Sequence, residues 1–143
     1  MPFEYLDDIA TSDVAFQARG DTLEEMFMAA ADATMNVMVG DLETIAETER
    51  RLIQVEADAV DMLLFDLLQE LIFYKDAEQL LLRVKEIRVD REGDLFTAEA
   101  EASGEVLNPL KHDLVVDVKA VTLHRYKVEE TSGGWKATVI LDI

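Results

Sequence analysis

The sequence predicts an α+β fold, a two-layer sandwich in which two helices pack on a largely antiparallel sheet. Apolar residues recur at helical spacing in residues 23–38 and 60–72, and they alternate with period two in most of the chain after residue 80. Strands that follow helices in this order favour helices gathered on one face of an antiparallel sheet. We predict a single domain over residues 1–143, because no repeat, low-complexity tract or proline-rich linker divides the chain.

The first predicted elements are a strand pair near the N-terminus and a helix. In residues 14–18 every second side chain is apolar, which is the period of a half-buried strand, and Gly20 ends this strand. Thr22 and Glu25 have the spacing of a capping box, in which both side chains bind backbone amides at the start of a helix. The helix is expected to end at Gly40.

A surface connection, a short strand and a second helix are predicted next. The acidic residues 41–50 form the connection, and residues 51–56 alternate well enough for a strand. Asp58 is the expected N-cap of the second helix. The broad apolar stripe of residues 60–72 predicts that this helix lies in the middle of the fold.

The remaining strands are predicted from alternation between apolar and polar residues. They cover residues 80–89, 95–105, 114–128 and 135–142, with hairpin turns at 91–94 and 132–134.

The charge balance excludes some classes of partner. The chain has 31 acidic and 13 basic residues, a formal net charge of −18. Such a surface repels nucleic-acid phosphates and anionic lipids, so we expect no direct nucleic-acid binding and no membrane association. The acidic residues either keep the protein soluble, in ordinary or high salt, or serve to dock on a basic partner or hold a cation.

Cysteine content and the apolar segments bear on the compartment. The chain has no cysteine, which excludes disulfides, thiolate zinc sites and cysteine nucleophiles. The first residues lack the pattern of a secretion signal. The longest apolar segment, residues 59–74, is too short and too often interrupted by polar side chains to span a bilayer. We expect a cytoplasmic location.

The histidines and glycines supply little catalytic chemistry. His112 and His124 are the only two histidines, and their spacing does not place both on one helix face, so a zinc site is not indicated. His124 is expected in a strand as a hydrogen-bonded structural residue. His112 lies in a turn-rich stretch and is either a contact residue or a solvated loop residue. No nucleophile elbow, phosphate-binding glycine loop or dinucleotide fingerprint is present.

One acidic residue stands in an otherwise apolar strand. Trp135, Val139 and Leu141 lie on one face of the last predicted strand, so Asp142 points to the other face beside the C-terminal carboxylate of Ile143. If buried alone, this charge would cost free energy, and a nearby cation or donor is the usual compensation. Clustered oxygen atoms are the ligands of hard cations. The alternative is an aspartate that is simply solvated.

Ten segments together resemble the archease family over essentially the whole chain. They are FEYLD (3–7), SDVAF (12–16), TLEEMF (22–27), AAA (29–31), MNVM (35–38), LLFDLLQELIF (63–73), GE (104–105), KH (111–112), VKAVTLH (118–124) and LDI (141–143).

This resemblance implies an accessory factor and not an independent enzyme. The partner would be the tRNA-splicing RNA ligase, a GTP- and metal-dependent enzyme that joins 2′,3′-cyclic-phosphate or 3′-phosphate ends to 5′-hydroxyl ends. The factor would promote guanylylation of the ligase and sustain multiple turnover. Two alternatives are a small metal-dependent phosphoester hydrolase, with His124 or His112 as proton carrier, and a general chaperone of RNA-modifying proteins.

The resemblance also implies a metal site. The family's ligands map onto Asp13, Asp142 and Ile143. We expect a divalent cation there, calcium first, with magnesium or manganese as alternatives. The family's motif Leu-Asp-His-Thr-Ala-Asp is represented by residues 6–13, which lack the histidine and are two residues longer, so Asp7 or Asp8 is an alternative to Asp13.

Four residues are expected to contact the ligase. They are Lys111, His112, Lys119 and His124. Leu123 replaces the tyrosine that is common before the strand histidine of the family, which leaves the role of His124 open.

Overall fold

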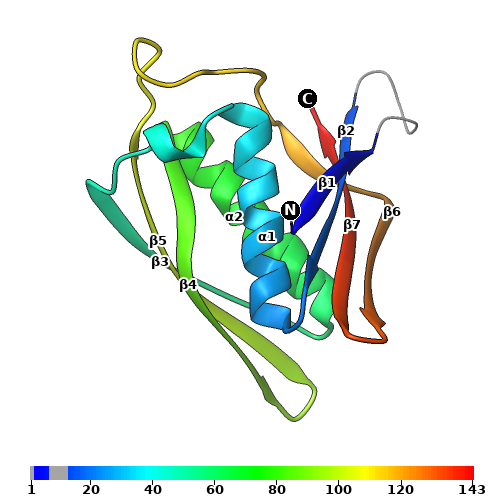
Figure 1. Ribbon diagram of the computed structural model, residues 1–143. Helices are drawn as coiled ribbons and strands as arrows, with labels where there is room; N and C mark the ends of the chain where they lie inside the picture. The colour runs from blue at the N-terminus through cyan, green and yellow to red at the C-terminus, as the bar shows by residue number, and fades with distance from the viewer. Residues whose placement is uncertain (1, 7–12) are drawn as a thin grey trace.

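The computed structural model describes residues 2–6 and 13–143. The described elements, in chain order, are β1 (Phe3–Leu6), β2 (Asp13–Gly20), α1 (Leu23–Met38), a 3-10 turn η1 (Leu42–Thr44), β3 (Glu49–Ala57), α2 (Val60–Glu78), β4 (Leu80–Glu92), β5 (Leu95–Val106), β6 (Ala120–Thr131) and β7 (Gly134–Asp142) (Figure 1).

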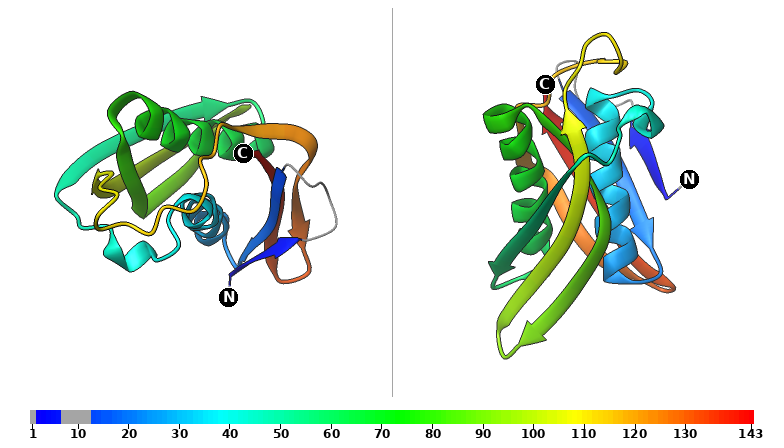
Figure 2. Two further views of the ribbon diagram at one scale, coloured as in Figure 1. Left: turned by 90° about the horizontal axis from the view of Figure 1, so that it is seen from above. Right: turned by 90° about the vertical axis from the view of Figure 1, so that its left-hand side faces the viewer.

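The predicted α+β class is confirmed, but the strands form two sheets where the sequence predicted one. A four-stranded sheet has the order β1-β2-β7-β6, a three-stranded sheet has the order β3-β5-β4, and all pairs are antiparallel. α1 packs on β2 and β4, and α2 packs on β3, β4 and β6. The helices therefore lie between the two sheets and share their core with both, as the view from above shows (Figure 2).

The start of α1 follows its sequence signature closely. The Thr22 Oγ1 accepts a hydrogen bond from the Glu25 amide at 3.1 Å, and the Glu25 carboxylate accepts one from the Asp21 amide at 3.3 Å. These bonds satisfy backbone donors that have no partner inside the helix. The helix ends at Met38, and Val39 is its C-cap.

The start of α2 differs from the prediction. Its N-cap is Ala59, which makes no side-chain cap bond, so the expected capping by Asp58 is wrong. The packing of α2 is as expected: the apolar stripe is buried in the core, with Leu63, Leu64, Leu67, Leu68, Leu71 and Ile72 at most 3% exposed. Burial of this stripe, and not a cap, therefore stabilises the helix.

The segment before β6 is not the strand expected from residue 114. β6 begins at Ala120, and the preceding residues cross the end of α1. The Gly40 amide donates to the Asp113 carbonyl at 2.8 Å, and the Val115 amide donates to the Met38 carbonyl at 2.9 Å. These bonds join the segment to the end of α1, and the register already places Ala120 opposite Asp142, the last residue of β7, so residues 114–118 have no β7 partner. We call residues 107–119 the crossover, because they lead from the three-stranded sheet to the four-stranded sheet (Figure 1).

Neither α1 nor α2, the helices of the described part of the chain, is long and apolar enough to cross a membrane.

Candidate functional site

Strand register brings the two ends of the sequence together. β2 and β7 pair antiparallel with Asp13 directly opposite Asp142. Directly opposite residues of an antiparallel pair project from the same face, with Cβ atoms about 4.5–5.5 Å apart. Both aspartates are half-buried. The two carboxylates therefore lie side by side at one end of the four-stranded sheet.

The face that carries this pair is the one turned away from the helices. Phe16, Val139 and Leu141 are buried in the core that the sheet shares with the helices. Asp13 and Asp142 have the opposite parity along their strands, so they project to the other face. The sequence predicted this orientation for Asp142.

Two like charges placed opposite each other destabilise a β-ladder unless something offsets the repulsion. Within residues 2–6 and 13–143, neither Asp13 nor Asp142 forms an ion pair with a basic side chain. A bound cation would offset this repulsion. The pair therefore fits the requirement that the sequence analysis set for a cation site.

Neighbouring strands hold Asp142 in place on both sides. Asp142 pairs with Asp13 of β2 and with Ala120 of β6, and its carbonyl accepts a hydrogen bond from the Lys119 amide at 2.8 Å. The side chain of Ile143 is half-buried against the core. The last two residues are therefore anchored, and the main-chain carboxylate of Ile143 follows directly after the Asp142 side chain.

The number of side-chain donors at this site is small. In the described part of the chain, no group of three or more histidine, cysteine, aspartate or glutamate side chains is placed to hold a metal ion. A third donor at Asp13 and Asp142 would come from Ile143, as the resemblance to the family implies, or from a residue outside the described part of the chain. The alternatives Asp7 and Asp8 lie outside the described residues.

The donor chemistry of Asp13, Asp142 and Ile143 fits a hard divalent cation. All three would donate carboxylate oxygen, and none offers nitrogen or sulfur. Calcium, magnesium and manganese prefer such ligands, whereas zinc and copper favour imidazole or thiolate. Three oxygen groups also leave coordination positions open for other oxygen ligands, because these cations take six or more.

His112 is buried, so the expectation of a solvated loop residue is wrong, and its contact with the ligase stays a prediction. Only 4% of His112 is exposed, its Nδ1 accepts a hydrogen bond from the Asn108 amide at 2.9 Å, and its Nε2 lies 2.7 Å from the Glu105 carboxylate. Because an amide can only donate, Nε2 carries the ring proton and donates it to Glu105. His112 therefore fixes the start of the crossover.

Lys111 reinforces the same attachment. Its ammonium lies 2.6 Å from the Glu105 carboxylate, and this hydrogen bond lowers the pKa of Glu105. Burial opposes the shift, and the His112 hydrogen bond adds to it. Lys111 keeps nearly half of its side chain exposed, so it remains available to a partner.

Lys119 and His124 are exposed near the N-terminal end of β6. Lys119 is the last residue of the crossover, and its backbone amide binds Asp142. His124 lies in an irregular stretch between Thr122 and Lys127 where the pairing of β6 with β7 shifts, and Arg125 adopts a left-handed conformation there with φ 54°. The exposure of His124 shows that the expectation of a hydrogen-bonded structural histidine is wrong. Regular alternation in the sequence gave no sign of this bulge.

A buried lysine was not anticipated from the sequence. Lys75, in the last turn of α2, is 6% exposed, and its ammonium donates to Asp117 at 2.6 Å, to the Val118 carbonyl at 2.8 Å and to Asp76. Burial lowers the pKa of Lys75, but the bonds to Asp117 and Asp76 outweigh it and raise the pKa. Lys75 thereby anchors the end of the crossover that leads to Lys119 and Asp142.

Comparison with known proteins decides the family. The sequence profile of the archease protein family (MTH1598/TM1083) matches residues 3–143. The chain belongs to the archease family. The protein archease of Methanosarcina mazei is 38% identical over 144 residues, which cover 99% of this chain and 95% of that protein. The protein archease of Pyrococcus abyssi is 35% identical over 134 residues, 93% and 94% of the two chains.

A solved structure has the same archease fold. The solution structure of Methanobacterium thermoautotrophicum protein 1598 aligns with a TM-score of 0.85 and 35% sequence identity, and the alignment covers 99% of both chains. The resemblance noted from the sequence motifs is therefore confirmed as archease family membership.

Proposed function

We propose that this archease-family protein is an accessory factor that activates the tRNA-splicing RNA ligase. In this proposal it promotes guanylylation of the ligase and multiple turnover through a divalent cation held by Asp13, Asp142 and Ile143. The observation that carries the proposal is the direct register pairing of Asp13 with Asp142, which places two carboxylates beside the end of the chain. A solitary catalyst would need a proton carrier there, and one candidate, His112, is buried and committed to Glu105.

The protein's own residues have three tasks in this mechanism. Asp13 and Asp142 bind the cation on a rigid ladder, and the Lys119 amide holds the backbone of Asp142. The exposed side chains of Lys111, Lys119 and His124 contact the ligase. When bound, the cation would supply positive charge near the phosphate oxygens of the guanylyl donor, where charge develops during transfer.

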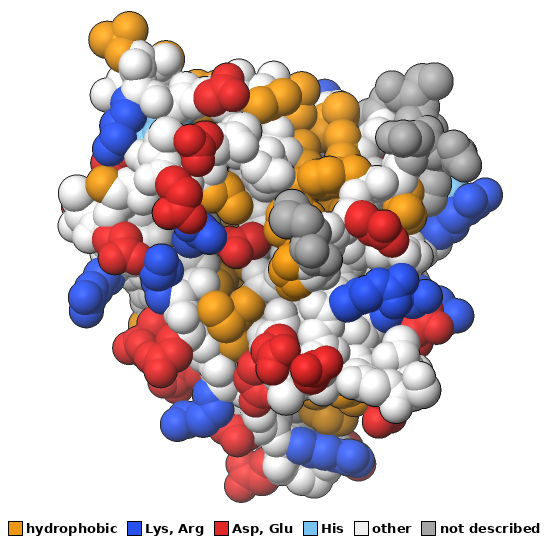
Figure 3. Space-filling model, viewed as in Figure 1, with side chains coloured by type: hydrophobic (Ala, Val, Ile, Leu, Met, Phe, Trp, Pro, Cys, Tyr) orange, Lys and Arg blue, Asp and Glu red, His pale blue; other side chains and the backbone are white. Residues whose placement is uncertain are grey.

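The net charge of −18 favours a basic surface on the ligase. On the face shown in Figure 3, acidic side chains are spread between lysines and arginines and do not form one continuous patch. Electrostatic attraction would then raise the rate at which the two proteins meet more than it determines the orientation in which they dock. We expect ligase activation to weaken with added salt, because long-range attraction between exposed charges is screened.

A single-turnover guanylylation assay of the cognate ligase with GTP tests the proposal. Adding this protein should raise the rate, and Asp13→Asn or Asp142→Asn should abolish most of the increase. The matched control is Asp21→Asn, an exposed aspartate beyond the other end of β2, which should behave like the unmodified protein. Full activation by Asp142→Asn would contradict the proposed cation site.

Further measurements separate the alternative functions and test the bound metal. Phosphoester hydrolysis by the purified protein alone would favour the hydrolase. Binding to several RNA-modifying proteins without any change in guanylyl transfer would favour the chaperone. Calorimetric titration with calcium, magnesium and manganese should show binding that Asp142→Asn removes. Extending the chain by one glycine after Ile143 should weaken that binding, because the terminal carboxylate moves by about one residue length, roughly 3.5 Å. The cytoplasmic location stays a prediction.

A further inference from the structure

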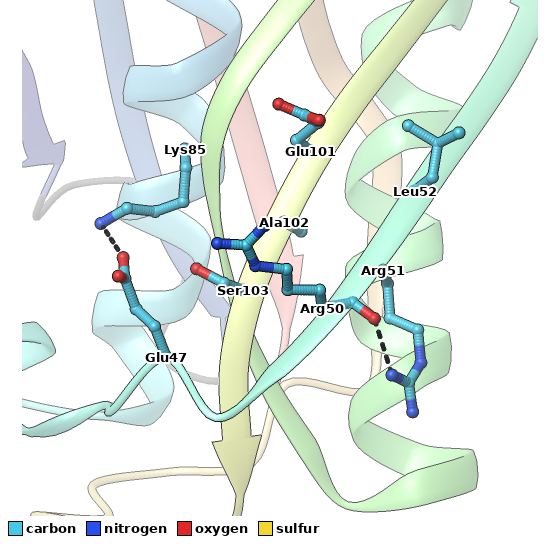
Figure 4. Close-up of a pocket in the computed structure, with 8 residues that line it drawn as sticks. All are labelled: Glu47, Arg50, Arg51, Leu52, Lys85, Glu101, Ala102 and Ser103. Carbon is cyan, nitrogen blue, oxygen red and sulfur yellow. Dashed lines mark hydrogen bonds and ion pairs between the residues drawn. The ribbon is translucent and has the colours of Figure 1, made fainter.

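A polar cavity lies on the outer face of the three-stranded sheet, away from the candidate metal site. Its volume is about 400 Å³, within the range of small-molecule sites. It is lined by Glu47, Arg50, Arg51, Leu52, Lys85, Glu101, Ala102 and Ser103 (Figure 4). In Figure 4 the helices lie behind the strands, so the cavity opens on the side that the core does not use.

Ser103 places an unpartnered hydroxyl in this cavity. Only 6% of the residue is exposed, and its Oγ has no hydrogen-bond partner among the described residues. Buried hydroxyls are nearly always hydrogen-bonded, because an unpaired one costs free energy. The Glu47 carboxylate lies near enough for the hydroxyl to contribute to its lowered pKa, but outside hydrogen-bond geometry. The Ser103 hydroxyl is therefore free to bind a ligand.

Arg50 supplies a guanidinium group that is not engaged elsewhere. Its side chain extends from β3 across β5 toward Ser103 (Figure 4). Among the described residues it forms no ion pair, whereas the neighbouring Arg51 turns away to pair with Glu49 and Glu78. The planar guanidinium can donate two parallel hydrogen bonds to an oxyanion.

Lys85 adds a second cation at the opposite wall. It lies at a bulge of β4, where the register shifts between Val84 and Glu86, and its ammonium is 2.7 Å from Glu47. This hydrogen bond is the main cause of the lowered pKa of Glu47. With Arg51 included, three cationic side chains and two carboxylates line the cavity, although the whole chain has a net charge of −18.

We propose that this cavity binds the phosphate group of a small organic phosphate. Arg50 and Ser103 donate hydrogen bonds to the phosphate oxygens, and Lys85 adds positive charge. A phosphate offers oxygens in several directions, which matches donors that approach from β3, β4 and β5 better than the two oxygens of a carboxylate do. Leu52, 54% exposed, contacts the organic part, and Glu101 accepts from its hydroxyl groups. This proposal does not depend on the ligase function.

The test is a titration of ¹⁵N-labelled protein with inorganic phosphate and with glucose 6-phosphate, at constant ionic strength, with sodium acetate as the competing oxyanion. We expect saturable shifts of the Arg50, Lys85 and Ser103 amides, tighter binding of glucose 6-phosphate than of phosphate, and acetate affinity at least about tenfold weaker. Equal responses to phosphate and acetate, or no saturable response to either phosphate, would overturn the proposal.

Two variants and a control complete the test. Arg50→Gln and Ser103→Ala should each weaken glucose 6-phosphate binding by about tenfold or more. Arg88→Gln is the matched control, because Arg88 lies on the same sheet but pairs with Asp90 and does not line this cavity. Without ligand, Ser103→Ala should unfold at nearly the same temperature as the unmodified protein, since its hydroxyl forms no hydrogen bond among the described residues. Equal weakening by Arg88→Gln would indicate nonspecific attraction and overturn the proposal.

Discussion

The two sheets of this archease-family protein place charge in opposite ways. The four-stranded sheet sets two carboxylates, Asp13 and Asp142, opposite each other at its end. The three-stranded sheet surrounds a buried hydroxyl, Ser103, with cationic side chains on its outer face. Both arrangements occur in a chain of net charge −18. Strand register, and not net charge, therefore decides where charged side chains of each sign come together.

Contacts of two kinds hold the strands of the two sheets in place. The edge strand β6 is tied to α2 by polar bonds: the Gln69 side chain accepts from the Val121 amide at 2.8 Å, and the Tyr126 hydroxyl donates to the Asp61 carbonyl at 2.6 Å. In the three-stranded sheet, Gly104 of β5 lies so close to β4 that a side chain has no room.

The largest expected effect comes from Gly104→Ala in the three-stranded sheet. An added Cβ would collide with the Leu81 carbonyl oxygen, which is backbone and cannot rotate away, so β4 and β5 must separate. We expect the free energy of unfolding to fall by about 3 kcal/mol or more in urea denaturation. Gly133→Ala, at the β6–β7 turn, meets no atom within 4 Å and should change it by less than about 0.5 kcal/mol.

This substitution also sharpens the comparison between the sheets. If the two regions are independent, Gly104→Ala should weaken phosphate binding at Arg50 and Ser103 while the surviving folded protein still binds a divalent cation. Loss of both phosphate binding and cation binding in protein that remains folded would show that the sheets are coupled through the core.

The second-largest loss of stability is expected at the end of the crossover that leads into the four-stranded sheet. Lys75→Met keeps most of the side-chain volume but leaves Asp117 and the Val118 carbonyl without their ammonium partner. We expect a loss of about 1–3 kcal/mol in unfolding free energy, because a buried carbonyl becomes unpaired while the carboxylates remain solvated. Faster hydrogen exchange of the Lys119 amide, which binds Asp142, should accompany it.

The control for this prediction is Lys127→Met. Lys127 lies on β6, is mostly exposed and contacts Glu129 only at 3.7 Å, so its removal should have little effect on stability. If both variants lose the same stability, the burial of the Lys75 ammonium is not what anchors the crossover.

Local signals in the sequence predicted the helices and the faces of the strands well. The capping box of Thr22 and Glu25 and the apolar stripe of α2 depend on neighbouring residues only, and both are present in the structure. The parity of Asp13 and Asp142 likewise follows from alternation within each strand. Their pairing depends on which strands become neighbours, and here the family resemblance supplied what periodicity could not.

Long-range features were beyond the reach of sequence patterns. The division into two sheets depends on strand partners, and the crossover was mistaken for a strand because its apolar residues alternate partly with charged ones. Burial of Lys75 and His112 arises from contacts with the crossover and with Glu105. The unpartnered hydroxyl of Ser103 is visible only once β3, β4 and β5 are assembled.

The smallest expected loss of stability is at Glu105, which binds the start of the crossover, and it depends on pH. Glu105→Gln keeps an oxygen acceptor for His112 and Lys111 but removes the charge that both attract. Lys111 holds the pKa of folded Glu105 below its ordinary value of 4.5, so the carboxylate stabilises the fold above that pH. This contribution is lost as the pH falls through the lowered pKa of the folded state.

Urea unfolding from pH 7 to pH 3 measures this effect. The unmodified protein should be more stable than Glu105→Gln near neutral pH, by less than Lys75→Met costs. The difference should shrink toward zero as the pH falls through the lowered pKa of folded Glu105, because protonated Glu105 and glutamine are both uncharged. Glu92→Gln, an exposed residue at the end of β4, should show no such convergence. If the difference in unfolding free energy between the unmodified protein and Glu105→Gln stays constant over this range, the negative charge of Glu105 does not hold the crossover on the three-stranded sheet. Packing would then be what holds it.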